Sequence, residues 1–434
     1  MAGRPSALTA LTLAGLCSLG PPAYAERAWS VRGQATFVVQ YHPAFHAAYS
    51  GLNSLSPASL GDETFDATVF LGVRLWRGGS VHADPEIDQG FGLSNTLGVA
   101  GFPSGEAYKV GQATPYLRLQ RLFFRQTFIF GRADTLNAPA LSTVANPPDK
   151  LVVTLGKFAV TDIFDNDWYA HDPKSDFLNW SLIDTGTFDY AADAWGYSYG
   201  GAVEWTHDWW TLRTGLFDLS RVPNSTQLVR GFGEYEAVGE FEGRYRWHNR
   251  AGQAKVTAFV NDGRMGSYAD ALALARATNA IPSTALVRKR ASRAGVSIDV
   301  DQEVTHSLGI FLRAGINDGS KEAYEFTEIN RTLAAGLSLK GYEWKRPDDT
   351  FGAAFVVNGL SQSARTYFAT GGLGILIGDG RLNYSTEDIF ESYYSAQLTS
   401  WLAASFDYQF VQHPAYNRDR GPVHIFAVRL HIET

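Results

Sequence analysis

The mature part of this chain has no cysteine and no long apolar segment. The single cysteine, Cys17, lies in an N-terminal leader, so a protein that begins at Glu26 would have no disulfide and no thiolate metal site. No run of about 18 apolar residues follows the leader, which excludes transmembrane helices. The net charge is −7 at pH 7, and the chain therefore lacks the basic excess that nucleic-acid binding requires.

The first 25 residues predict a secretory signal peptide. Arg4 precedes an apolar stretch at 7–19, and Ala23-Tyr-Ala25 forms a small-x-small cleavage site before Glu26. The apolar stretch is too short to span a bilayer. We therefore expect residues 1–25 to be removed during export and residues 26–434 to form one domain.

Apolar and polar residues alternate at every second position through most of the mature chain. In 402–412 the even positions are mainly apolar, and the odd positions are small or polar. In 232–247 one face carries six charged residues: Glu234, Glu236, Glu240, Glu242, Arg244 and Arg246. Burial of an unpaired charge has a high free-energy cost, so this face must line water. The pattern predicts strands with one face toward lipid and the other toward a wet interior.

About sixteen segments of the chain share this alternation, an even number typical of bacterial outer-membrane barrels. They lie near 32–46, 64–77, 80–91, 113–130, 151–161, 195–206, 209–219, 231–247, 251–262, 290–301, 306–317, 328–341, 349–360, 389–400, 402–412 and 423–433. A helical pattern outside the leader occurs only at 268–277, with a second helical turn near 361–370.

The connections between these segments alternate between long and short. Long connections lie near 47–63, 92–112, 162–194, 263–289 and 361–388, whereas 78–79, 207–208 and 248–250 are short. The connection at 131–150 breaks this rule, since it is long where a short turn is expected. We predict an all-β fold, a transmembrane antiparallel β-barrel of about 16 strands with long extracellular loops and short periplasmic turns.

Five stretches resemble a known family when they are taken together and in order. They are DPEIDQGFGLSNTLGVAGFPSGE at 84–106, LRLQRLFFRQ at 117–126, FDYAADAWGY at 188–197, RTGLFDLS at 213–220 and GDGRL at 378–382. This set is similar to the carbohydrate-selective porin (OprB-like) family. The resemblance implies a sixteen-stranded barrel in the outer membrane of a Gram-negative bacterium, through which mono- or small oligosaccharides diffuse passively into the periplasm.

The resemblance also implies partners: small sugars as solutes, outer-membrane lipid and the barrel-assembly machinery. It leaves a monomer and a homo-oligomer both open. The chain ends Leu430-His-Ile-Glu-Thr434, without the terminal aromatic residue that usually helps the assembly machinery recognise the last strand. This ending puts the efficiency of insertion in question more than the fold.

A sugar-selective pore needs hydrogen-bonding charges at a narrowing and aromatic faces for the sugar ring. The alternation places charges on the interior face, each of which could simply wet the channel wall: Arg74, Arg213, Arg244, Arg313, Glu86, Asp88, Glu204, Glu240, Glu242 and Glu391. Our hypothesis is therefore that these interior charges select the solute as a group, and it assigns this role to no single one of them.

The alternation slips in phase between Arg118 and Arg125. A β-bulge there would turn Arg121 and Arg125 inward near Arg118; the alternative is an irregular segment at the rim. The loop at 162–193 interleaves acids with aromatic residues that include Trp168. We expect this loop to fold into the barrel and form a constriction, with an external lid or an aromatic cluster at the membrane rim as the alternatives.

Catalytic and metal-binding patterns are weak in this sequence. The histidines show no His–Ser arrangement for an outer-membrane hydrolase. The acid pair Glu86 and Asp88 lies in a wet lumen, without the apolar pocket that a catalytic acid needs. No twelve-residue calcium loop is found, so we expect no metal or other cofactor. A non-selective or anion-preferring porin remains the first alternative function, and a barrel enzyme or adhesin the second.

Overall fold

The computed structural model describes residues 28–107, 110–130, 149–326 and 328–434. The predicted signal peptide and most of the long connection at 131–150 lie outside these residues. Among the described residues, no helix is long and apolar enough to span a membrane.

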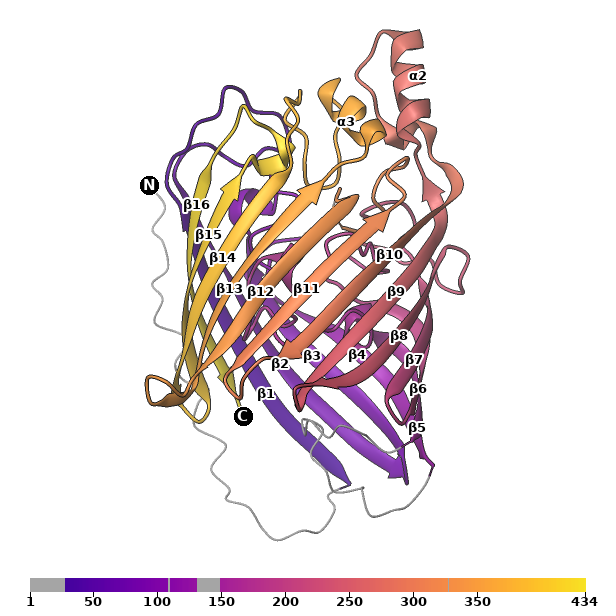
Figure 1. Cartoon of the computed structure of the whole chain (residues 1–434). Helices are drawn as coiled ribbons and strands as arrows, with labels where there is room; N and C mark the ends of the chain where they lie inside the picture. Colours follow the sequence, from indigo (N-terminus) through magenta and orange to yellow (C-terminus); the bar gives the residue numbers. More distant parts are fainter. Residues whose placement is uncertain (1–27, 108–109, 131–148, 327) are drawn as a thin grey trace.

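Sixteen antiparallel strands form one closed barrel (Figure 1). They are β1 (Trp29–His42), β2 (Leu60–Trp76), β3 (Gly79–Gly90), β4 (Gln112–Ile129), β5 (Lys150–Phe158), β6 (Ser198–His207), β7 (Trp210–Asp218), β8 (Tyr235–Trp247), β9 (Arg250–Met265), β10 (Lys289–Glu303), β11 (Leu308–Asn317), β12 (Arg331–Gly341), β13 (Arg346–Gly359), β14 (Glu387–Thr399), β15 (Leu402–Gln412) and β16 (Val423–Glu433). Each strand pairs with its neighbours in sequence, and β1 closes the sheet against β16, for example through Phe37 opposite Leu430. The predicted fold class is confirmed.

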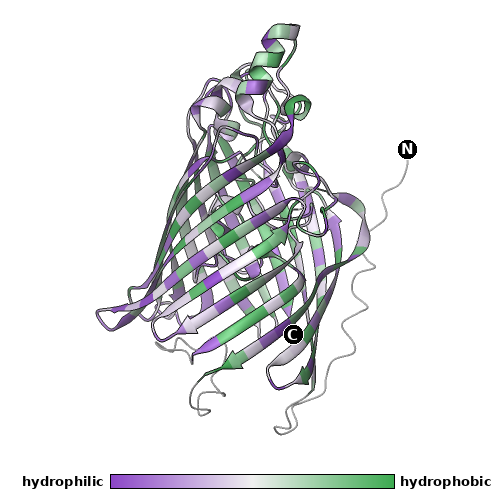
Figure 2. Ribbon diagram, turned by 90° about the vertical axis from the view of Figure 1, so that its right-hand side faces the viewer, coloured by the Kyte–Doolittle hydropathy of each residue, from purple (hydrophilic) through white to green (hydrophobic). Residues whose placement is uncertain are grey.

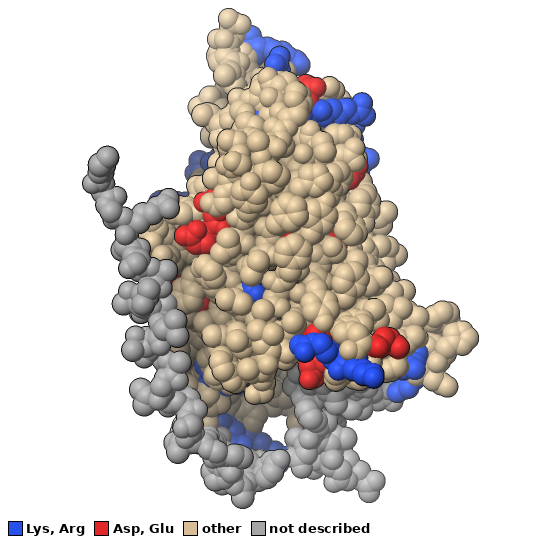
Figure 3. All heavy atoms as spheres, turned by 90° about the vertical axis from the view of Figure 1, so that its left-hand side faces the viewer, with Lys and Arg blue, Asp and Glu red and all other residues tan. Residues whose placement is uncertain are grey.

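The strand faces follow the sequence alternation. On β15, Phe406 is 54% exposed, whereas Asp407 beside it is buried. On β16, Phe426, Val428, Leu430 and Ile432 point outward. Figure 2 shows hydrophobic and hydrophilic residues alternating along the strands, and Figure 3 shows a broad part of the outer wall with few charged side chains. Apolar side chains that are exposed on the outer wall need a lipid environment, because in water they would form a large hydrophobic patch.

The two ends of the barrel differ in their connections. Six short turns join β2 to β3, β6 to β7, β8 to β9, β10 to β11, β12 to β13 and β14 to β15. The other end carries the long loops, including helices α2 (Tyr268–Thr278) and α3 (Gln362–Ala369), which rise above the strands in Figure 1. Both helices match the helical patterns predicted at 268–277 and near 361–370.

Loops fill much of the barrel interior. The connection between β5 and β6 contributes Phe164, Phe177, Trp180, Phe188 and Tyr190 to the main buried cluster, together with wall residues. It also holds a 3-10 turn, η3 (Val160–Asp162), and the short helix α1 (Trp180–Ile183). We call residues 159–197 the inserted loop. The prediction that this loop folds into the barrel is confirmed, and it is not an external lid.

Candidate functional site

Carboxylates on the barrel wall hold the inserted loop in place. Glu391 on β14 accepts hydrogen bonds from the backbone N–H groups of Leu178 (2.5 Å) and Asn179 (2.9 Å). Glu236 on β8 accepts one from Ala191 (2.6 Å). Both carboxylates are fully buried. Loop backbone buried inside a barrel needs partners for its polar groups, and these interior acids supply them.

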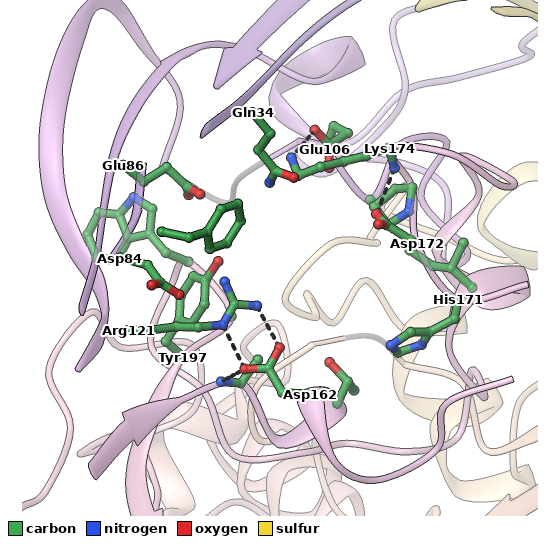
Figure 4. Close-up of a pocket in the computed structure, with 18 of the residues that line it drawn as sticks. Gln34, Asp84, Glu86, Glu106, Arg121, Asp162, His171, Asp172, Lys174 and Tyr197 are labelled. Atoms are coloured by element: carbon green, nitrogen blue, oxygen red, sulfur yellow. Dashed lines mark hydrogen bonds and ion pairs between the residues drawn. The ribbon is translucent and has the colours of Figure 1, made fainter. Parts of the chain in front are cut away.

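A cavity of about 590 Å³ remains between the inserted loop and the wall formed by β1 to β4. Figure 4 shows its side chains pointing toward a common opening. The labelled residues come from the wall (Gln34, Asp84, Glu86 and Arg121), from the β3–β4 connection (Glu106) and from the inserted loop (Asp162, His171, Asp172, Lys174 and Tyr197). The candidate solute path therefore lies to one side of the barrel.

Two ion-paired clusters face each other across this cavity. The Arg121 guanidinium binds both carboxylate oxygens of Asp162, through Nε at 2.7 Å and Nη2 at 2.6 Å, and lies over the Tyr197 ring. The Lys174 ammonium lies 2.8 Å from Asp66 and 2.7 Å from Glu106. Bidentate pairing fixes the plane of the guanidinium, so Arg121 keeps a defined orientation toward the cavity.

Protonation of the loop acids in this site is set by burial and by their partners. Burial would raise the pKa of the Asp162 carboxyl, but the Arg121 charge and its hydrogen bonds keep that pKa below its usual value. Burial, together with the Asp165 charge, raises the pKa of Asp184 to about 7. Burial and the Arg313 charge lower the pKa of His171 to about 4. At neutral pH, His171 is therefore uncharged and Asp184 is close to half protonated.

Four aromatic rings line the same cavity in a continuous row. Phe102 stacks on Trp180 with ring centroids 5.3 Å apart, and Trp180 stacks on Phe326 at 5.6 Å. Tyr190 follows at 4.4 Å from Phe326. Trp180 and Tyr190 belong to the interleaved aromatic residues of the loop at 162–193 that was predicted to form the constriction, whereas Phe102 and Phe326 were not predicted as path residues. Phe102 lies in the motif at 84–106, but no local pattern distinguishes Phe326, which comes from the loop between β11 and β12.

The predicted β-bulge in β4 is confirmed. Asp84 on β3 pairs with Arg121, whereas the next residue, Pro85, pairs with Leu119 and leaves Gln120 as the extra residue. Proline has no N–H for the ladder, so an irregularity at this point costs little. The bulge places Gln120 and Arg121 in succession on the interior side, after which Arg125 also faces the cavity.

The structure brings Glu86, Arg121 and Arg125 into the cavity lining, with Asp88 and Arg118 close by. Asp88 is buried and accepts a hydrogen bond from Gln120 at 3.1 Å. The guanidinium of Arg118 lies 3.3 Å from the centroid of Trp195, which itself lines the cavity.

The other predicted site residues lie apart from this lining. On β7 and β8, Arg213 binds Glu240 (2.7 Å) and Glu242 (2.6 Å), and Glu242 also binds Arg244. Arg74 is exposed near the short-turn end of β2, and Trp168 is 40% exposed in the inserted loop.

Arg313 is fully buried beneath the inserted loop, where it donates hydrogen bonds to the backbone oxygens of Leu182 (2.6 Å) and Asp165 (3.1 Å). Its partner Asp299 also binds Lys255, at 3.3 Å. These interactions fix the inserted loop to the wall, so Arg313 is a residue that positions the loop.

A family model described as "Carbohydrate-selective porin, OprB family" matches residues 53–433. The chain belongs to the OprB family of carbohydrate-selective porins. This OprB-family porin also shares its fold with solved channels. The high-pH structure of Pseudomonas putida OprB superposes with a TM-score of 0.70 at 13% identity, over 94% of each chain. The outer membrane channel DcaP of Acinetobacter baumannii gives 0.51 at 10% identity, over 94% of this chain and 97% of that one. No curated protein sequence matches the chain.

Family and fold identify this OprB-family protein as an outer-membrane channel of a Gram-negative bacterium. In such barrels the long loops lie outside the cell and the short turns face the periplasm. The inserted loop and the cavity therefore lie inside the barrel, between the extracellular loops and the periplasmic turns.

Proposed function

We propose that this porin conducts mono- or small oligosaccharides passively into the periplasm, and that the cavity beside the inserted loop is its selective constriction. The observation that carries the proposal is the pairing, in one cavity, of an aromatic row with fixed hydrogen-bonding charges. A sugar ring has a C–H face that packs on aromatic rings and hydroxyls that bind charged groups.

The charges of the lining favour a neutral solute. Four cationic side chains line the cavity, Arg32, Arg121, Arg125 and Lys174, against six acidic ones, Asp84, Glu86, Glu106, Asp162, Asp172 and Asp184. Arg121 is paired with Asp162 and Lys174 with Glu106, so much of this charge is compensated within the lining. An anion-preferring porin would need a basic excess here, and the lining supplies none.

Arg121 is the residue we assign to sugar hydroxyls. Two of its nitrogens bind Asp162, which leaves Nη1 for a solute, and Asp162 holds the side chain still while solute passes. Arg74, Glu86, Asp88, Arg118, Arg125, Trp168, Glu240, Glu242, Arg244 and Arg313 remain proposed contributors, either at the path or by holding its walls. We propose that the chain has no catalytic activity.

Planar-bilayer recording of the purified porin tests this function. We expect stepwise channels that glucose blocks in part and phosphate does not. Hydrogen bonds to charged groups contribute about 1.5–3 kcal/mol, so Arg121→Gln should weaken glucose block about tenfold. Phe326→Leu should also weaken it, by removing one ring of the aromatic row.

Two matched controls leave the cavity intact. Arg77→Gln removes an exposed arginine from the turn after β2, and Phe390→Leu removes a ring from the outer wall. Both should keep wild-type block. A channel without glucose block, or with anion preference in a salt gradient, would favour a general porin; a purified protein without conductance would favour a barrel enzyme or adhesin.

A further inference from the structure

Three arginines project outward from the barrel at the extracellular ends of β9, β10 and β12. Arg264 lies one residue before the end of β9, Arg290 is the second residue of β10, and Arg331 is the first residue of β12. Their neighbours in the strands alternate between buried and exposed, and this alternation places all three on the lipid-facing side. We call them the rim arginines.

Two of the rim arginines are direct cross-strand partners, because Arg290 on β10 pairs with Arg264 on β9. Like charges directly opposite each other destabilise a sheet. Arg290 has an acid partner, Asp262, at 2.6 Å. Within the described residues, no side-chain acceptor is bonded to the guanidinium of Arg264 or of Arg331. The three charges are thus compensated by one carboxylate, in a protein whose net charge is −7.

The outward strand residues at the extracellular end differ in charge between the two sides of the barrel. On the other side of the barrel, the outward residues at the same end include the acids Glu63 on β2 and Asp388 on β14. An excess of arginine on one sector of an acidic protein indicates a local anionic partner. Lipids of the outer leaflet contact the outer wall at this height.

An exposed aliphatic surface begins beside Arg331, whereas the polar pair Asp262 and Ser292 comes next below Arg264 and Arg290. Ile316 of β11 is the cross-strand partner of Arg331 and is 57% exposed. Further toward the membrane centre the exposed residues are Val256, Ile298, Leu312 and Leu333, each between 46% and 53% exposed. Strands β9 and β10 face the viewer in Figure 2, and they carry hydrophilic residues where they approach α2. Charge above an aliphatic face is the pattern that an anionic lipid requires of its binding site.

We propose that the rim arginines and the aliphatic surface below them bind the phosphorylated glycolipid of the outer leaflet, lipopolysaccharide, through the phosphates of its lipid A. The guanidinium groups bind phosphate oxygens, and the acyl chains pack on the aliphatic face of β9 to β12. Phosphate at this position also removes the repulsion between Arg264 and Arg290. This site is separate from the solute path and does not depend on sugar selectivity.

Binding of purified diphosphoryl lipid A to the full porin in non-ionic detergent, measured by native mass spectrometry, tests the proposal. Arg264→Gln with Arg331→Gln removes two charges that hold no internal bond of the barrel, so the variant should fold and conduct normally. Arginine near an anionic membrane surface contributes roughly a fivefold gain in affinity per residue. We expect the double variant to bind about 25-fold more weakly.

The matched control is Arg77→Gln with Arg418→Gln, which removes two exposed arginines from turns and loops away from this face. It should bind diphosphoryl lipid A like the wild type, and wild-type porin should bind dephosphorylated lipid A weakly. Equal affinity of the double variant and the wild type would overturn the proposal, as would equal affinity for dephosphorylated lipid A. A change of oligomeric mass in the double variant would also overturn it, by identifying the face as an interface between copies of the chain.

Discussion

Release of the inserted loop from Glu391 should widen the channel. The Glu391 carboxylate is fully buried and accepts hydrogen bonds from two loop N–H groups, those of Leu178 and Asn179. Glu391→Ala leaves both donors without this acceptor. Hydrogen bonds contribute about 0.5–3 kcal/mol each, depending on the charge of the acceptor, so the seated loop loses about 1–6 kcal/mol. That loss changes the ratio of seated to unseated loop by about 5-fold to 10⁴-fold.

The loop should detach locally and not leave the barrel. Arg429 on β16 still donates to the backbone oxygens of Pro173 (2.5 Å) and Asp176 (2.9 Å), and Arg313 still holds Leu182. The segment between these anchors includes Trp180, so its release should disturb the aromatic row. We expect a higher single-channel conductance with more current noise, together with weaker glucose block.

Planar-bilayer recording measures both effects, and heat-modifiable gel migration checks that the barrel has assembled. Ser392→Ala is the control, since Ser392 follows Glu391 on β14 and faces the opposite side of the wall. Glu391→Gln keeps one acceptor and should give an intermediate conductance. If Glu391→Ala assembles and still shows wild-type conductance and block, the inserted loop does not form the constriction.

Two further predictions concern charge and register. Burial raises the pKa of Asp184 to about 7, so this lining residue gains negative charge as the pH rises through about 7. Its contribution to stability falls as the pH rises above the unfolded-state pKa. Reversal potentials should therefore shift toward cation preference between pH 6 and 8, and Asp184→Asn should abolish that shift. Deletion of Gln120 removes the extra inward residue of the bulge and leaves Arg118, Leu119 and Arg121 in regular alternation, with both arginines still inward. We expect the deletion variant to keep the heat-modifiable folded form, and loss of that form would show that the bulge itself is needed for assembly.

The wall of the barrel could be predicted in detail because its information is local. Each strand shows which residues face lipid through its own alternation, as in Phe406 and Asp407 on β15. The bulge at Gln120 could also be predicted, since the alternation of apolar residues changes phase within that one segment. The position of the inserted loop inside the barrel was suggested only by the length of the loop and by its interleaved acids and aromatic residues.

The roles of individual charges could not be predicted in the same way. Arg121 and Arg313 look alike in sequence, as inward arginines on strands. Arg121 faces the cavity, whereas Arg313 is 0% exposed under the inserted loop. The difference depends on which loop covers each strand, and alternation carries no information about that.

The sequence by itself determined that this protein is a sixteen-stranded barrel with a wet interior, because a two-residue period forces adjacent side chains onto opposite faces of a strand. Only the tertiary structure decided where the channel runs. Trp180 meets Phe102 and Phe326 across separations of 78 and 146 residues, and Glu391 holds the loop that carries Trp180 from 212 residues away along the chain. Contacts at such separations depend on how the closed barrel and its loops pack together.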